Sequence, residues 1–494
     1  MKTWFCGVND AVNNKYNIAI YVLLLIIILF AAFQYYSLAL KLTQLEIERH
    51  GKGYVSDEVW YVPSARNILR KTLGIVPSLP GGKYGASIIY EGNIEIAWIR
   101  KVAMKYGVSV VDENYHKIKA FYIESNNLNN INAFIQNISA YYNISDIVYG
   151  WRIPDAAGIN EYLNLEHPPL VKYLIALSIL LLGDYPLYWR IPNIIAGALI
   201  VFFVFLSIRK LTNNPWLGLV ASLLVSIDPI MRYLSSIALL DVFVALFSVI
   251  TFYLAITRKY MLSILLAIIG STAKFNTLFV LIPVYMLYIR RELKKDNSFI
   301  NFIYNTTLFF LLVSGLFLAV QVLISIPLIS IIGFESWLNQ SIFGAIKWHT
   351  SVKCAGAGCP ASSAPWDWFL GTNGFVLYYI SSHDTLVALG YWPLWALALA
   401  FSILFIPAYR IDRKTAYPWL FLLGILSGYI LLWIIGGRTQ YSFYSVQLAP
   451  FIYSFLMLST IYIITQKEKI LCVLNDWYKL LKYLWRLVVE LLTC

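Results

Sequence analysis

Residues 18–40, IAIYVLLLIIILFAAFQYYSLAL, decide the fold because they run without a charged side chain over the length of a membrane span. At 1.5 Å per residue, a helix of roughly 20 residues crosses the ~30 Å hydrocarbon core of a bilayer. No short apolar core followed by a small-residue cleavage site occurs here, as it would in a cleavable signal peptide. The stretch therefore predicts a retained first transmembrane helix.

Composition extends this prediction to the whole chain. Of its 494 residues, 59% are hydrophobic and 13% are charged, and the mean hydropathy is +0.67. Soluble domains usually carry about 25% charged residues. The net charge of +12 lies in short basic clusters between apolar runs, which is the pattern that orients membrane proteins. These features indicate a polytopic membrane protein and give no support to nucleic-acid binding.

Apolar runs of spanning or nearly spanning length follow the first one. They lie at 191–208, 216–234, 240–257, 260–273, 276–289, 302–326, 385–408, 416–435 and 446–465. The basic clusters are Arg209-Lys210, Arg258-Lys259, Arg290 to Lys295, Arg410 to Lys414, and Lys467 with Lys469. If all are cytoplasmic, the runs alternate without conflict, provided that 168–183 does not cross. That segment begins with two prolines and contains Lys172, so we expect a helix in the outer leaflet.

The predicted fold is all-α, with about ten transmembrane helices, both termini inside and a large first outer loop. The expected units are a first span (1–40), the outer loop (41–190), a transmembrane catalytic core (191–326), a second outer loop (327–384), C-terminal spans (385–465) and a cytoplasmic amphipathic tail (466–494). The first loop is long enough to fold into a small membrane-capping subdomain. The tail alternates basic and apolar residues at helical spacing, which is typical of an interfacial helix.

The cysteines offer one candidate disulfide. Of five, only Cys354 and Cys359 share a loop, which would suit a disulfide on an oxidising side. None shows the spacing of metal ligands. No internal repeat of the kind that transporters carry is visible.

Ionisable residues gather at the predicted outer ends of the apolar runs. They are Asp57, Glu58, His167, Lys172, Arg190, Asp228, Arg232, Asp241, Lys274 and Arg438. Charges at membrane depth are costly and are usually functional. Lys and Arg can hold a phosphate leaving group, and a carboxylate can deprotonate a hydroxyl acceptor. Each residue also has a structural explanation: Arg190 and Lys274 can snorkel, and Asp228 can end a helix.

Six short motifs in this set occur in a specific order. They are Ser56-Asp-Glu-Val-Trp-Tyr61, Glu166-His-Pro-Pro-Leu-Val-Lys172, Trp189-Arg-Ile-Pro192, Asp228-Pro229 with Ser235-Ser-Ile-Ala-Leu-Leu-Asp241, Ala273-Lys-Phe275, and the stretch from Arg438 to Phe451. In this order the chain resembles the protein O-mannosyltransferases and the related aminoarabinose transferases. These are multi-span C-type glycosyltransferases that use polyprenyl-phosphate sugars.

The resemblance implies a role for each site residue. Asp57 would be the general base, and Glu58 would support it or position the acceptor. The donor phosphate would be held by Arg190, Arg232, Lys274 and Arg438. The substrates would be oriented by His167, Lys172, Asp241 and Tyr444. No cofactor is implied. Asp57 and Asp241 could share a divalent ion, as in some oligosaccharyl relatives, but the nearest members use none.

The chain also departs from the family's pattern. Ser236 stands where relatives have Arg, and Arg232, one helical turn earlier, could substitute for it. Tyr444 replaces a family His, and Ser445 replaces the Tyr that follows it. The second outer loop has no room for the β-trefoil insert of eukaryotic members. These changes bear on the sugar and the acceptor more than on the reaction class.

The leading hypothesis is transfer of a sugar, with mannose as the family's own, from a polyprenyl or dolichyl phosphate to a hydroxyl of an exported protein. The site would face the extracytoplasmic side of a plasma membrane, or of the ER membrane in a eukaryote. One alternative keeps the chemistry with a lipid or lipid-linked glycan as the acceptor. Two others are a transporter of lipid-linked sugars and an inactive homologue that serves as an assembly subunit.

Overall fold

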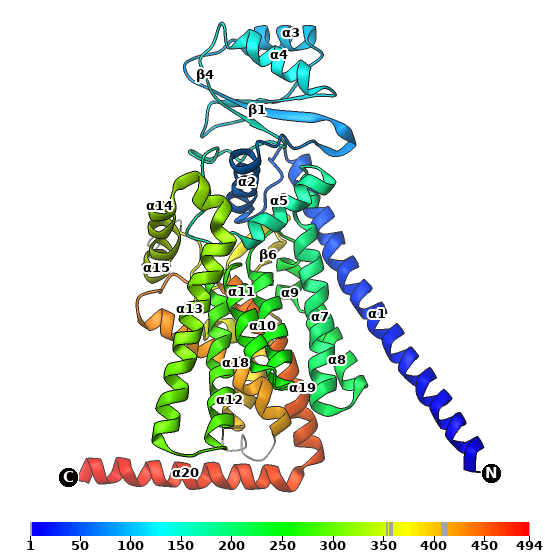
Figure 1. Ribbon diagram of the computed structural model, residues 1–494, viewed down its shortest axis with the longest axis vertical. Helices are drawn as coiled ribbons and strands as arrows, with labels where there is room; N and C mark the ends of the chain where they lie inside the picture. The colour runs from blue at the N-terminus through cyan, green and yellow to red at the C-terminus, as the bar shows by residue number, and fades with distance from the viewer. Residues whose placement is uncertain (1, 352–353, 355–358, 407–412, 494) are drawn as a thin grey trace.

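The computed structural model describes residues 2–351, 354, 359–406 and 413–493. A helix bundle carries a smaller α/β module on one of its ends (Figure 1). The bundle helices are α1 (Lys2–Glu48), α7 (Ile191–Thr212), α8 (Pro215–Ile227), α10 (Asp241–Ile256), α11 (Tyr260–Ser271), α12 (Leu281–Leu293), α13 (Phe299–Ile332), α17 (Trp392–Leu404), α18 (Arg413–Ile434) and α19 (Ala449–Thr465).

Every apolar run expected to cross the membrane contains one of these helices, and the expectation of a mostly helical membrane protein is confirmed. Within the described residues, the segments long and apolar enough to cross are Ile18–Glu48, Pro186–Thr212, Phe299–Ile332 and Lys414–Ile434. A fifth arises if α19 and α20 (Lys467–Thr493), which are bent by 103° at their junction, count as one. The other runs form shorter helices, so ten full-length spans are not found in this part of the chain.

One break shows why the helices are short. α8 ends at Asp228, where Pro229 cannot continue the hydrogen-bond ladder. The Asp228 carboxylate caps the next helix, α9 (Pro229–Leu234), by accepting a hydrogen bond from the Ile230 N–H at 3.0 Å. It also accepts hydrogen bonds from the Trp395 indole at 3.0 Å and from the Tyr453 hydroxyl. The broken helix thereby joins α17 and α19.

The module corrects the all-α prediction. Its chain order is β1 (Tyr84–Tyr90), α3 (Ile96–Lys105), β2 (Ser109–Asp112), β3 (Ala120–Ser125), α4 (Leu128–Ile138) and β4 (Ile144–Tyr149). The strands lie in the order β2-β3-β1-β4, and every neighbouring pair is antiparallel. This is the split βαββαβ arrangement. The Asn-rich segment 126–143 forms mainly α4, whose N-terminus is capped by the Asn127 side chain.

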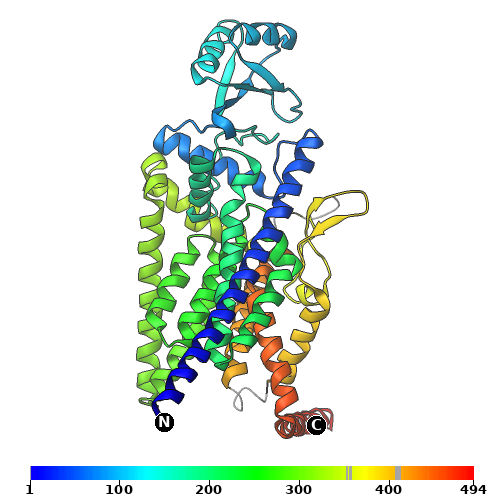
Figure 2. The same ribbon diagram turned by 90° about the vertical axis from the view of Figure 1, so that its right-hand side faces the viewer.

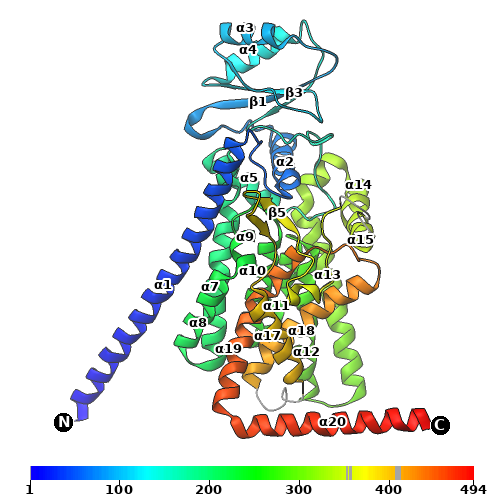
Figure 3. The ribbon, with the colours of Figure 1, turned by 180° about the vertical axis from the view of Figure 1, so that it is seen from behind.

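The module has its own hydrophobic core between the sheet and its two helices. Alternate residues of the strands, such as Ile88 and Ile123, pack against Ile99 of α3 and Phe134 of α4. The helices lie on the side of the sheet away from the bundle (Figures 1 and 3). The opposite face of the sheet therefore points toward α2 (Glu58–Ile68) and the outer end of the bundle.

The segment 168–183 forms α5 (Leu170–Leu182), a 13-residue helix packed beside α2 at the module end of the bundle. It stays at this end and does not run along the length of the bundle, as Figure 1 shows. This agrees with the expectation, drawn from the charge clusters, that it does not cross.

The second outer region is built from short elements: α14 (Phe334–Leu338), α15 (Gly344–Thr350), α16 (Asp367–Leu370) and a hairpin of β5 (Val376–Tyr379) and β6 (Thr385–Val387). Because β6 is a strand, the first part of the run predicted to span 385–408 is not helical, and α17 begins only at Trp392. Cys354 and Cys359 form the predicted disulfide.

The features predicted to be cytoplasmic lie at the end of the bundle opposite the module. The α7–α8 and α12–α13 turns lie there, and α20 runs across that end nearly perpendicular to the helices above it (Figures 1 and 2). Exposed apolar side chains on α20 include Leu474, Leu481 and Trp485. Among the basic clusters, Arg410 lies outside the described residues.

At the junction between module and bundle, we expect the replacement of Gly150 by alanine to lower stability. Gly150 follows β4 with φ +110°, and an added Cβ would lie 2.2 Å from an Asp184 carboxylate oxygen. Gly158 also has a positive φ, +70°, but an added Cβ would meet nothing within 4 Å. We expect Gly150→Ala to cost about 1–3 kcal/mol more than Gly158→Ala, because both strain the backbone and only one clashes. Thermal unfolding in detergent measures the difference, and equal midpoints would contradict this junction.

Candidate active site

Glu58, at the start of α2, is fully buried and receives four hydrogen bonds. The Arg190 Nε–H donates to Oε1 at 2.8 Å and Nη2 donates to Oε2 at 2.7 Å. The backbone N–H groups of Val55 and Ala238 donate at 2.8 and 2.7 Å. A buried carboxylate is tolerated only when it is paired and hydrogen-bonded in this way. Glu58 therefore ties the segment after α1 to α7 and to the loop before α10.

Arg190 uses all five of its N–H donors within the protein. Apart from Glu58, they reach the Ala39 carbonyl at 3.0 Å, the Thr43 hydroxyl at 2.9 Å and the Gly53 carbonyl at 3.0 Å. The side chain is completely buried. In this structure, Arg190 has no donor left for the phosphate that the resemblance assigns to it. Its geometry is that of an anchor for the segment that carries Asp57 and Glu58.

Asp57 occupies the N-cap position of α2, next to the buried Glu58, and is itself partly exposed. Its charge acts on the phenols of Tyr61, Tyr441 and Tyr444. Burial, and then the Asp57 charge, raise the pKa of Tyr61 well above its usual value. The Asp57 carboxylate is thus within electrostatic range of residues from α2 and from the segment that precedes α19.

Lys274 and Asp241 form a second buried pair. The Lys274 Nζ lies 2.8 Å from Asp241 Oδ1, and both side chains are at most 3% exposed. The same ammonium lies 4.1 Å from the centre of the Tyr444 ring, in cation–π geometry. Asp241 opens α10, and Lys274 directly precedes the 3₁₀ helix η3 (Phe275–Val280).

Tyr444 lies within electrostatic range of both acidic groups. It lies in the 3₁₀ helix η6 (Ser442–Gln447) and is buried. The charges of Asp241 and Asp57 both act on its phenol, while Lys274 covers its ring. Tyr444, the residue that replaces a family His, therefore contacts the Lys274 ammonium and lies within electrostatic range of both the Asp241 and the Asp57 carboxylates. This convergence is the centre of the candidate site.

His167 and Lys172 lie beside this centre on the α5 side. The Lys172 ammonium donates to the backbone carbonyls of Leu163, Asn164 and His167 at 3.1, 2.5 and 2.8 Å. Because its ammonium binds three backbone carbonyls, Lys172 holds the 163–167 turn in place. The His167 ring packs edge-on against Tyr61, with ring centroids 5.7 Å apart.

Arg232 and Arg438 are placed differently from the other predicted residues. Both side chains are exposed, and the Arg438 guanidinium lies 5.3 Å from the centre of the Trp433 ring. Ser236 is fully buried and its hydroxyl donates to the Arg232 carbonyl. The structure therefore does not bring the Arg232 side chain into the environment of Ser236, as substitution for the family Arg would require.

The structure adds His349, which sequence reasoning missed. Its ring lies 5.8 Å from that of His167, although His349 belongs to α15 in the second outer region. The His349 carbonyl also lies close to Gly437, beside Arg438. A histidine in a predicted outer loop was the available signal, but nothing in the sequence paired it with a residue 182 positions earlier.

Residues 166–319 match the family model described as dolichyl-phosphate-mannose-protein mannosyltransferase. The resemblance is confirmed for these residues. They include the motifs around His167, Arg190, Asp228, Asp241 and Lys274, whereas Asp57-Glu58 and the 438–451 stretch lie outside the match.

Curated relatives match over a shorter region. Polyprenol-phosphate-mannose–protein mannosyltransferases of Mycolicibacterium smegmatis and Corynebacterium glutamicum are each 33% identical over 105 residues, 21% of this chain. The chain covers 20% of the length of these relatives.

Two solved structures show a lower similarity. ArnT from Cupriavidus metallidurans bound to undecaprenyl phosphate has a TM-score of 0.40 and 13% identity, over 60% of this chain and 50% of ArnT. The Archaeoglobus fulgidus oligosaccharyltransferase in the apo form has a TM-score of 0.38 and 13% identity, over 83% and 51%.

The burial of the Glu58–Arg190 pair predicts a large stability effect. Glu58→Gln should cost about 3–5 kcal/mol, because it leaves the Arg190 charge buried without its partner. Glu113→Gln is the matched control, since Glu113 pairs with Arg100 in a two-bonded contact at 2.6 and 2.7 Å and Arg100 is 59% exposed. That change should cost less than about 1 kcal/mol. Similar unfolding midpoints for both variants in detergent would refute the anchoring role of Glu58.

Proposed function

We propose that this protein is a membrane glycosyltransferase that moves a sugar from a polyprenyl or dolichyl phosphate to a hydroxyl group, with inversion at the anomeric carbon. The observation that carries the proposal is the convergence at Tyr444. A partly exposed carboxylate, Asp57, and a buried ammonium, Lys274, act on the same phenol from different segments of the chain. A base and a cation that both act on one side chain suit a reaction that releases a proton and a phosphate.

In the proposed step, Asp57 takes the proton and Lys274 faces the negative charge of the leaving group. The acceptor oxygen attacks the anomeric carbon, and its proton passes to the Asp57 carboxylate. The bond between the anomeric carbon and the phosphate oxygen breaks, and its electron pair leaves with the lipid phosphate. Lys274 offers positive charge to that leaving group. No second acid is needed, because a phosphate diester becomes a stable monoester without protonation.

The chemistry is proposed to need no metal or other cofactor. Among the described residues, no three His, Cys, Asp or Glu side chains are grouped so as to hold a metal ion. The Lys274 ammonium already supplies a positive charge 2.8 Å from Asp241 Oδ1. Transfer that disappears with EDTA and returns with Mn²⁺ or Mg²⁺ would count against this part of the proposal.

The proposed topology has ten crossings, both termini in the cytoplasm, and the module and candidate site on the extracytoplasmic side. The α7–α8 and α12–α13 turns, which carry basic clusters, and the amphipathic α20 lie at the end of the bundle opposite the module. Positive residues favour the cytoplasmic side. The membrane would be the plasma membrane, or the ER membrane in a eukaryote.

For the substrates, we propose mannose on a polyprenyl phosphate and a hydroxyl of an exported protein. The curated relatives named above are mannosyltransferases with protein acceptors, and the family model has the same description. The alternative acceptor is a lipid or a lipid-linked glycan. Radiolabelled mannose from the donor would appear in protein in the first case and in the organic extract in the second.

Two other classes predict different behaviour. A transporter would move the lipid-linked sugar without breaking its glycosidic bond. An inactive homologue would show no transfer but would co-purify with an active transferase. Neither class gives a reason for a base and a cation to converge on Tyr444.

Asp57→Asn should lower the rate of sugar transfer by roughly two to four decades, because the amide cannot accept the proton of the acceptor hydroxyl. The assay follows transfer of label from a polyprenyl-phosphate sugar in membranes. Glu95→Gln, which changes an exposed acid at the N-cap of α3, serves as the control. An Asp57→Asn protein that transfers at the wild-type rate would eliminate Asp57 as the base.

Lys274→Met should raise the KM for the lipid donor by roughly tenfold or more, because a charge-assisted contact to phosphate contributes about 1.5–3 kcal/mol. Lys294→Met, at the opposite end of the bundle and exposed, should leave KM unchanged. Since Lys274→Met leaves Asp241 without its cation, Lys274→Met/Asp241→Asn provides a charge-neutral comparison. Unchanged donor KM in both forms would remove Lys274 from the phosphate site.

A further inference from the structure

Residues 52–70 carry Asp57, Glu58 and all of α2, and they contact the βαββαβ module at both ends. At the first end, the Lys52 ammonium lies 2.5 Å from an oxygen of Asp112. At the other end, Arg70 Nη1 lies 3.0 and 3.2 Å from the two carboxylate oxygens of Asp146. The exposed fractions are 10% and 5% for the first pair, and 25% and 22% for the second.

The two acids stand on opposite edges of one sheet. Asp112 ends β2 and Asp146 lies in β4, the outer strands in the order β2-β3-β1-β4. Three spacings of about 4.8 Å separate the edges by roughly 14 Å. The 11 residues of α2 measure roughly 16 Å along the helix axis. The edges of the sheet are thus about as far apart as α2 is long, and the residues that they hold, Lys52 and Arg70, lie before and after that helix. Figure 1 shows α2 below the module.

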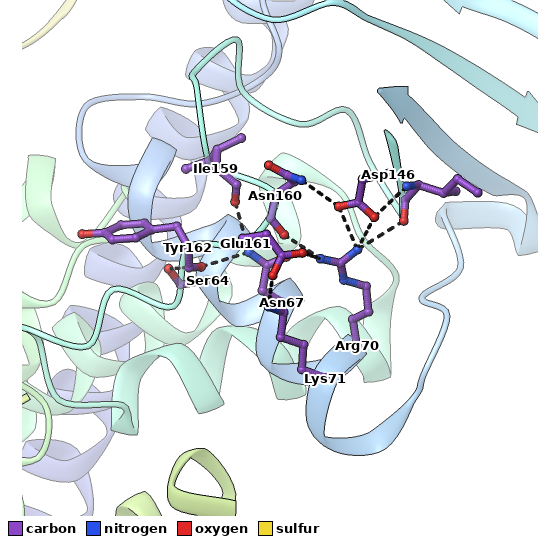
Figure 4. Close-up of polar contacts among 10 residues, drawn as sticks. Ser64, Asn67, Arg70, Lys71, Asp146, Ile159, Asn160, Glu161 and Tyr162 are labelled. Atoms are coloured by element: carbon purple, nitrogen blue, oxygen red, sulfur yellow. Dashed lines mark hydrogen bonds and ion pairs between the residues drawn. The ribbon is translucent and has the colours of Figure 1, made fainter. Parts of the chain in front are cut away.

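The Arg70 contact belongs to a network rather than to an isolated surface pair (Figure 4). Arg70 Nη2 also donates to the Asn160 carbonyl at 2.6 Å, and the Asn160 amide donates to Asp146 at 2.7 Å. One turn earlier on α2, the Asn67 amide donates to the carbonyls of Ile159 and Tyr162 at 3.1 and 2.9 Å. One face of α2 is therefore bound to β4 and to the segment that leads toward His167.

The Lys52 end is supported in the same way. The Tyr54 hydroxyl donates to the Arg152 carbonyl at 2.7 Å, and the Trp151 indole donates to the Lys52 carbonyl at 2.9 Å. Asp184 accepts hydrogen bonds from Arg66 of α2 at 2.6 Å and from the Trp151 N–H at 2.8 Å. The chain leaving β4 is thereby fastened to both flanks of the Asp57-Glu58 pair.

We propose that the βαββαβ module is a positioning device that sets the place of the Asp57 carboxylate relative to Lys274, Asp241 and Tyr444. Asp112 and Asp146 hold Lys52 and Arg70, and these four are positioning residues that do not touch the reacting atoms. The inference rests on Asp57 being the base of the proposed function. Displacement of a reacting group by about 1 Å can cost on the order of 100-fold in rate.

Asp146→Asn tests the device, with two measurements on the full-length protein in lipid nanodiscs. Hydrogen exchange of the amides in residues 58–68 should speed up, because the turn Leu69–Leu73, which continues α2, loses its charged contact with β4 through Arg70. In the transfer assay, kcat should fall roughly 10- to 100-fold while the KM for the lipid donor stays within about twofold. Arg70→Lys, which keeps the charge, should retain more of both properties than Arg70→Leu.

The control is Glu113→Gln, which breaks the Arg100–Glu113 pair inside the same module without touching residues 52–70. It should change neither the exchange of α2 nor kcat. If both variants accelerate α2 exchange equally, the module only contributes general stability and the device is refuted. Unchanged α2 exchange in Asp146→Asn refutes it as well.

The exchange measurement separates this inference from the proposed function. A wild-type protein without transferase activity, in which Asp146→Asn still loosens α2 selectively, would overturn the glycosyltransferase proposal and uphold the mechanical coupling. Full activity of the wild-type protein, with no selective effect of Asp146→Asn on α2 exchange, would uphold the glycosyltransferase proposal and overturn the mechanical coupling.

Discussion

The buried Glu58–Arg190 ion pair is the constraint on which the rest of the site depends. Removing two charges from water costs several kcal/mol each, so such a pair persists only with full hydrogen bonding. Here Arg190 spends five donors and Glu58 accepts four hydrogen bonds, drawn from α1, the 53–55 segment, α7 and the loop before α10. These elements cannot shift independently. Asp57 directly precedes Glu58 in the chain, so the ion pair also fixes the position of the Asp57 backbone.

The neighbouring charged residues therefore have different roles. Glu58 and Arg190 are saturated and hold the scaffold, whereas Asp57 is partly exposed next to them. The Lys274–Asp241 pair is a second buried ion pair, and its ammonium lies over the ring of Tyr444. A partly exposed carboxylate beside a closed ion pair can stay accessible while the backbone beneath it is fixed.

The first outer region is a folded module that is held against the bundle. A sheet with an independent core could have been a loosely tethered domain. Instead, both of its edge strands carry acids that hold the segment of α2, and Gly150 lets the chain turn against Asp184. Its helices face away from the bundle and its sheet faces α2. Its contacts with the bundle end include these two ion pairs and the ring contact of Trp151 with Tyr185.

Hydropathy alone located the helices of the bundle, the charge clusters separated its two ends, and the motifs selected Asp57, Asp241, Lys274 and Tyr444. Each of these features depends on local composition or short spacing, which a linear sequence displays directly. The sequence did not reveal the sheet, because strands such as β1 and β3 pair across about 35 residues and alternate too briefly to stand out. It suggested Arg190 and Lys172 as ligands, whereas the tertiary structure uses their donors on carboxylate, hydroxyl and carbonyl groups. Which charges are saturated and which stay accessible is decided by packing between distant segments, and only the folded chain brings those segments together.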